Sequence, residues 1–181
     1  MLRPDPLSGE LGVERAYAVT RDLERHMGQG ARALHGYYLD DVAEARRRGI
    51  EAARRRYEAA VEEAARLGSL PAAEAAAAAL VAAGGADLLA PDLARAGAEP
   101  VDRVRRRAAA LALGEGGYLV AVPVLLELFE SQTGEPLARA AALLRRLTGL
   151  DLDPDARERS AADVRRWLER RPLEGPFERR E

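Results

Sequence analysis

Two stretches of this sequence repeat one pattern. Residues 84–91 read GGADLLAP and residues 116–123 read GGYLVAVP, so each opens on two glycines, closes on a proline and is mainly apolar in between. The prolines are 32 residues apart (123 − 91), and the five residues RAAAL recur at the same spacing, at 107–111 and 139–143. A period of about 20 to 50 residues is typical of a solenoid, in which each unit buries its apolar face against its neighbours. The repeat therefore predicts an array of similar units.

The composition indicates that these units are helical. Hydrophobic residues make up 48% of the chain but aromatic residues only 4%, so the core has to be built mainly from Ala, Leu and Val. Strands favour aromatic and β-branched residues, whereas alanine is the strongest helix former. We therefore predict an all-α fold.

Each unit is expected to be a helical hairpin. One helix follows each glycine pair, and a second follows each Glu-Pro, where proline suits the first helical turn. The distance between the two prolines of a unit grows from 9 residues (100 − 91) to 13 (136 − 123), a difference close to one turn. The later copy is thus expected to have a longer first helix and a shorter second helix. The predicted helices are 88–96, 101–113, 119–131 and 137–147, preceded by 72–83 from a degraded unit.

The N-terminal part predicts two further helices, over 11–27 and 31–67. Apolar residues of the second follow a heptad spacing, which suits packing against another helix. Glycines 36 and 49 leave open whether it is one helix or two. The heptad positions are Ala43, Ile50, Tyr57 and Ala64, with Ala53, Ala60 and Leu67 at the second position.

The C-terminal part predicts a cap on the array. Ser160 and Asp163 are spaced as in a capping box, which places a helix start at Ser160. Trp167 then packs on the last hairpin or, alternatively, contacts a partner. The whole organisation is a loose lead-in (1–10), an N-terminal long-helix hairpin (11–70), repeats of period about 32 (71–149), a capping loop and helix (150–171) and a flexible tail (172–181).

The stretch GGYLVAVPVLLELFESQTGEPLARAAALLRRLTG resembles a bacterial HEAT-like repeat of the armadillo type. It has the early proline, the apolar first helix, the polar turn and the alanine-rich second helix ending in Leu-x-x-Leu-Thr-Gly. The resemblance covers about residues 71–171 and implies a short right-handed α-solenoid. The Asp–Arg ladder of that family is matched by Asp102 and Arg106 in one copy, and no equivalent pair is in register in the next.

The resemblance also implies a function. HEAT-like proteins mostly act as non-catalytic scaffolds or accessory subunits of assemblies, and they bind other proteins through stacked second helices. That surface would expose Arg103, Arg106, Arg139 and Arg146, which favours an acidic protein partner. All 28 basic residues are arginine, which reflects either genomic composition or selection for bidentate recognition of carboxylate or phosphate. The net charge of −2 argues against a general nucleic-acid binder.

No motif in the chain specifies catalysis, a cofactor or a metal. Cysteine is absent, and there is neither a phosphate-binding loop nor a GxSxG elbow. The two histidines, His26 and His35, lack metal-ligand spacing with Glu24, Asp40 or Asp41. The uncharged runs are too short to span a bilayer and no signal peptide is apparent, so we expect a cytoplasmic protein without a membrane span.

Two alternatives remain open from the sequence. Some HEAT-like proteins are enzymes, either bilin lyases or DNA glycosylases. Alternatively, the hairpin 11–67 self-associates through its heptad face and makes the protein a structural subunit.

Overall fold

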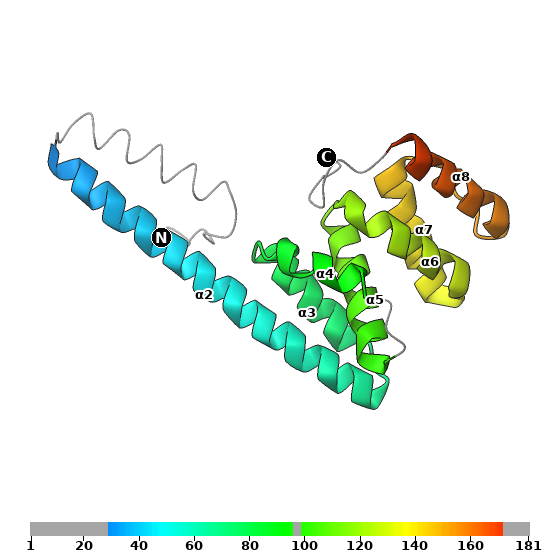
Figure 1. Ribbon diagram of the computed structural model, residues 1–181, viewed down its shortest axis with the longest axis horizontal. Helices are drawn as coiled ribbons and strands as arrows, with labels where there is room; N and C mark the ends of the chain where they lie inside the picture. Colours follow the sequence, from blue (N-terminus) through cyan, green and yellow to red (C-terminus); the bar gives the residue numbers. More distant parts are fainter. Residues whose placement is uncertain (1–28, 96–98, 172–181) are drawn as a thin grey trace, which may run out of the picture.

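The structure, a computed structural model, describes residues 29–95 and 99–171 (Figure 1). Its regular secondary structure over these residues consists of seven α-helices and two short 3-10 helices, with no strand. The predicted all-α fold is confirmed. The predicted lead-in, the helix over 11–27 and the tail over 172–181 lie outside the described residues.

Helix α2 (Gln29–Leu67) is one uninterrupted helix of 39 residues, so neither Gly36 nor Gly49 breaks it. Its N-terminal part extends beyond the other helices, and its C-terminal half lies along α3 and α5 (Figure 1). The buried side chains of that half are Tyr57, Val61 and Ala64. The heptad prediction is wrong at Ala43, which is exposed on the part of α2 that extends beyond the other helices. It is also wrong at Leu67, which is 60% exposed, because the helix ends there and Val61 instead takes a fully buried position.

The helices after α2 form four successive parts, and each part packs against the next. Helix α3 (Pro71–Ala82) lies between α2 and α5 (Figure 1). The first copy of the repeat then comprises η1 (Ala86–Leu88), α4 (Ala90–Leu93) and α5 (Pro100–Glu115). The second copy comprises η2 (Leu119–Ala121), α6 (Val122–Ser131) and α7 (Gly134–Thr148), and α8 (Arg157–Arg170) follows it.

The two copies differ in their first helix more than the sequence predicts. Helix α4 has only four residues, whereas α6 has ten. The predicted shortening of the second helix is wrong, since α7 has 15 residues and α5 has 16. The reason is that α5 begins at its proline, whereas α7 begins at Gly134, two residues before Pro136.

The helix ends correct the register of the repeat. Gly84 and Gly117 have φ angles of 90° and 84°, in the left-handed region that favours glycine. The next backbone N–H bonds to the carbonyl five residues earlier in both cases, from Gly85 to Leu80 and from Tyr118 to Leu113, each at 2.9 Å. Gly84 therefore matches Gly117, a spacing of 33 (117 − 84) rather than 32. The extra residue is Leu89, which separates η1 from α4, whereas η2 runs directly into α6.

The second copy supplies much of the core. The buried sets predicted for α6 and α7 are confirmed, except that Leu128 and Leu137 are only half-buried. Fully burying one such Leu or Phe side chain stabilises the fold by about 1.5–3 kcal/mol. The buried members are Ala121, Val124, Leu125, Phe129, Ala140, Ala141, Leu144 and Leu147.

Helix α8 packs against α6 and starts earlier than predicted. The capping box is wrong, because Ser160 lies inside the helix, three residues after its start. Its hydroxyl is buried and instead holds the preceding loop: it donates to the backbone carbonyl of Asp153 at 3.0 Å and accepts from the backbone N–H of Asp153 at 2.9 Å. The serine thus fixes the loop between α7 and α8.

Candidate functional site

Two of the four arginines expected on a partner surface lie close together at the start of α5. Arg103 is exposed. Arg106, one turn further on, donates from Nε to the carbonyl of Leu93 at 3.0 Å and pairs from Nη1 with Glu127 of α6 at 2.6 Å. Arg106 therefore ties α4 to α6 while remaining at the surface.

The other two arginines bind partners within the chain at some distance from this pair. Arg139 of α7 is 2.5 Å from both Glu74 of α3 and Glu115 of α5. Arg146 donates from Nη2 to the carbonyl of Gly114 at the end of α5. Burial lowers the pKa of Arg139, but the bonds and charges of Glu115 and Glu74 outweigh it and raise that pKa above its usual value. The structure thus assigns Arg139 and Arg146 to contacts between helices.

Arg139 belongs to a ladder across α3, α5 and α7. Glu74 accepts from Arg107 at 3.0 Å as well as from Arg139. All three residues lie ten positions before a glycine with positive φ, since 84 − 74, 117 − 107 and 149 − 139 are equal. Equivalent positions in successive helices therefore converge on one carboxylate that is only 10% exposed. The Asp102–Arg106 pair expected from the resemblance is not the link here, as Asp102 accepts from Arg95 at 3.2 Å.

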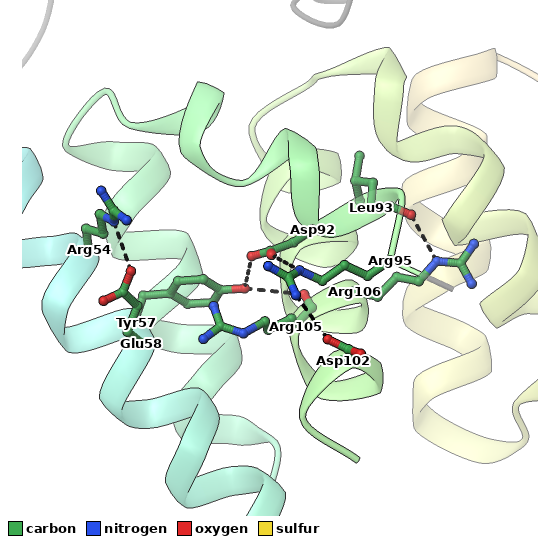
Figure 2. Close-up of polar contacts among 9 residues, drawn as sticks. All are labelled: Arg54, Tyr57, Glu58, Asp92, Leu93, Arg95, Asp102, Arg105 and Arg106. Carbon is green, nitrogen blue, oxygen red and sulfur yellow. Dashed lines mark hydrogen bonds and ion pairs between the residues drawn. The ribbon is translucent and has the colours of Figure 1, made fainter. Parts of the chain in front are cut away.

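A second polar group lies where α2 meets the first copy (Figure 2). The Tyr57 hydroxyl donates to Asp92 Oδ2 at 2.8 Å, and Arg95 Nε donates to Asp92 Oδ1 at 2.8 Å. Arg95 also reaches Asp102, and the Arg105 guanidinium lies 5.9 Å from the centre of the Tyr57 ring. We call Tyr57, Asp92, Arg95 and Asp102 the Asp92 cluster. Asp92 is buried, and both its carboxylate oxygens accept hydrogen bonds. We therefore interpret the cluster as a structural contact that holds α2 against the first copy.

The pKa values in the cluster agree with this role. Burial, followed by the charge of Asp92 and the hydrogen bond to it, raises the pKa of Tyr57 well above its usual value. The hydrogen bonds to Asp92 and then Asp102 raise the pKa of Arg95. The tyrosine therefore stays protonated as a donor and the arginine stays charged.

A concave feature lies between the end of α2, the start of α5 and α6. This groove has a volume of about 440 Å³, and Arg103 and Arg106 both line it. Its floor is apolar, and half-buried Leu70 and Leu128 lie beside buried side chains. The apolar lining residues are Ala64, Ala65, Leu70, Val104, Val124 and Leu128. We call this feature the α2–α5–α6 groove.

The polar lining of the groove is mainly basic. Three arginines, Arg103, Arg106 and Arg107, line it against one glutamate, Glu127. Ser131 and Gln132 complete the polar part, and the Ser131 hydroxyl donates to the Glu127 carbonyl at 2.7 Å. Sequence reasoning missed Arg107, Glu127 and the apolar floor, because the groove joins three helices whose crossing no local spacing reveals. The only available signal was the Arg103–Arg107 run opposite the PVLLEL segment.

Other kinds of site find no support in the described part of the chain. Within residues 29–95 and 99–171, no three His, Asp or Glu side chains are grouped as a metal site requires. His26 and the side chain of His35 lie outside that part. None of the described helices is long and apolar enough to cross a membrane.

The groove combines an apolar floor with guanidinium groups at its sides, which suits an acidic, partly apolar polypeptide segment. Comparison of the chain with protein families, with curated proteins and with solved structures finds no match.

Proposed function

We propose that this protein is a non-catalytic cytoplasmic interaction module that binds an acidic segment of another protein in the α2–α5–α6 groove, as a scaffold or accessory subunit does. One observation carries the proposal: three arginines and one glutamate surround a floor of aliphatic side chains in a groove of about 440 Å³. Arginine beside apolar surface is typical of the residues that contribute most to binding between proteins.

The contacts within the groove favour binding over catalysis. Glu127 is paired with Arg106, and the Ser131 hydroxyl is bonded to a backbone carbonyl. The groups that would have to act as base and nucleophile are therefore already engaged. The same pairing holds Arg106 in place, so its charge is presented at low entropic cost.

The partner segment is expected to be amphipathic. Its aliphatic or aromatic side chains would cover the half-buried Leu70 and Leu128, and its carboxylates would face the exposed Arg103. Arginine pairs with carboxylate in a bidentate geometry, which adds orientation to charge attraction.

We further propose that the array is a short right-handed α-solenoid of HEAT-like hairpins. Support comes from the helix ends at Gly84 and Gly117, which have the same conformation and bonding. It also comes from the ladder of Glu74, Arg107 and Arg139, which joins equivalent positions of α3, α5 and α7. Such an array would present the groove at the side of its first two layers.

Site-specific photo-crosslinking in the native cell tests the binding proposal. A photoreactive amino acid replaces Gln132, which lines the groove, or Ala142, an exposed residue of α7 that does not line it. We expect a protein that crosslinks from position 132 only, through a segment rich in Asp or Glu with apolar residues between. Sequencing of the crosslinked peptide identifies that segment.

The matched variants are Arg103→Glu and Arg159→Glu. Both residues are exposed, but only Arg103 lines the groove. Arg103→Glu is expected to abolish the crosslink and Arg159→Glu to leave it unchanged. Equal crosslinking from both positions, or a crosslinked segment without acidic residues, would contradict the proposal.

A further inference from the structure

A separate cleft lies at the C-terminal end of the array, along α8. It has a volume of about 420 Å³ and is lined by Leu150, Asp163, Arg166, Trp167, Arg170 and Arg171. Helix α8 is at the outer end of the molecule, beyond α6 and α7 (Figure 1). None of these lining residues belongs to the α2–α5–α6 groove.

The cleft is basic within an acidic chain. Residues 157–171 carry six arginines and three acidic residues, a net charge of +3, which leaves −5 for the rest of the chain (−2 − 3). In the cleft itself, three arginines face one acid, Asp163, which pairs with Arg166. The Arg166 side chain is nevertheless 61% exposed. The local positive charge therefore faces solvent.

Trp167 adds apolar surface at the centre of these charges. The ring is half-buried, and the Arg171 guanidinium lies 5.8 Å from its centroid. Leu150, also half-buried, lines the same cleft. Tryptophan and arginine are both among the residue types enriched where binding energy between proteins is concentrated.

We propose that this cleft is a second docking site, which takes an acidic segment of a partner protein with an apolar side chain placed on Trp167. Carboxylates of the segment pair with Arg166 and Arg170, which are one turn apart on α8. The exposed lining favours a polypeptide over an enclosed small molecule, because small-molecule sites bury most of their ligand. The charge of −5 on the rest of the chain repels a long polyanion such as nucleic acid, whereas a short acidic segment meets only the local positive charge.

The protein contains one tryptophan, so its fluorescence reports on this cleft alone. The full chain is titrated with a synthetic peptide that carries several glutamates around a central phenylalanine. We expect a saturable change in Trp167 fluorescence below about 1 mM peptide. Replacing the phenylalanine by serine, or the glutamates by glutamine, is expected to weaken binding by about tenfold.

The protein variants locate the effect. Arg166→Gln with Arg170→Gln is expected to weaken binding by about tenfold, because two charge-assisted contacts are lost. Arg159→Gln, exposed on α8 outside the cleft, and Arg103→Gln in the groove are expected to leave the titration unchanged. Circular dichroism checks that each variant is folded. Since Arg103→Gln removes a groove residue only, failure of the groove proposal and failure of this one are distinguishable.

Four outcomes would overturn the proposal. The first is no saturable fluorescence change, and the second is equal binding by the double arginine variant. The third is tighter binding of an oligodeoxythymidine than of the peptide, which would make the cleft a nucleic-acid site. The fourth is full competition by inorganic phosphate at equal concentration, which would reduce it to a simple anion site.

Discussion

The two copies of the repeat bury the same position with opposite chemistry. At the spacing of the two prolines, Asp92 of α4 corresponds to Val124 of α6 (124 − 92 = 32), and the two residues are 4% and 5% exposed. The valine packs in an apolar helix of ten residues, whereas the aspartate is bonded by Tyr57 and Arg95 in a helix of only four. A helix of four residues buries little apolar area, so α4 is also anchored to α2 by the hydrogen bond between Tyr57 and Asp92, whereas α6 is held by packing.

The largest expected effect is a loss of stability in the second copy, which is held by packing. Leu144→Asp places a carboxylate at a fully buried position of α7, and we expect it to destabilise the fold by more than about 4 kcal/mol and to unfold the C-terminal half. Ala142→Asp, two residues earlier on the exposed side, is expected to cost less than about 1 kcal/mol. Thermal melts followed by circular dichroism measure both. An unchanged melting temperature for Leu144→Asp would refute the core assignment.

The second prediction tests whether the hydrogen bonds to Asp92 stabilise the first copy. Asp92→Val gives α4 the residue of the packed copy but removes the buried acceptor of the Tyr57 hydroxyl and one of the two carboxylates that Arg95 contacts, and we expect a loss of about 2–3 kcal/mol. Adding Tyr57→Phe removes the hydroxyl group that has lost Asp92 as its acceptor. The double variant should therefore lose less than the sum of the two single losses, by about 1 kcal/mol. Urea denaturation measures the cycle, and strict additivity would show that the two side chains are not coupled.

The Asp92 cluster also predicts a pH dependence of stability. The pKa of Tyr57 is raised in the folded state, so above about pH 10 the unfolded chain releases a proton that the folded chain keeps. The free energy of unfolding from this residue is thus constant below about pH 10 and falls by about 1.4 kcal/mol per pH unit above it. Denaturation of the wild type and of Tyr57→Phe across this range isolates the contribution. Parallel curves for the two proteins would rule out a buried, protonated Tyr57.

The sequence predicts the stabilising contacts of the second copy far better than those of the first copy. Apolar spacing identifies the buried residues of α6 and α7 because those helices bury one continuous face, and Leu144 and Phe129 are where that pattern places them. In the first copy the stabilising contact joins Tyr57 to Asp92, 35 residues apart, and no local pattern reports a bond at that separation. The expected helix over 88–96 therefore proved too long.

For a related reason, the sequence predicted the arginines of the groove but not its apolar floor. Arg103 and Arg106 follow from their place on the second helix of the first copy, but the apolar floor also needs α2 and α6, whose crossing depends on the whole array. Likewise, the charges of Arg139 and Arg146 are evident in the sequence, whereas their partners lie on other helices. Periodicity tells which face of a helix is buried, but it does not tell which charged residue on the edge of that face meets which neighbour.

The smallest effect concerns Glu74 of α3, which pairs with one arginine from each copy. Arg107 of the first copy and Arg139 of the second share Glu74, so either arginine alone still neutralises that carboxylate. We expect Arg107→Gln and Arg139→Gln each to cost only about 0.5 kcal/mol, because the remaining pair is partly exposed to solvent. Together they leave a carboxylate that is 10% exposed without a counter-charge, so the double variant should lose about 1 kcal/mol more than the sum. Adding Glu74→Gln should recover that excess, and urea denaturation of the variants measures it. Additive losses would mean that the two arginines act independently of each other.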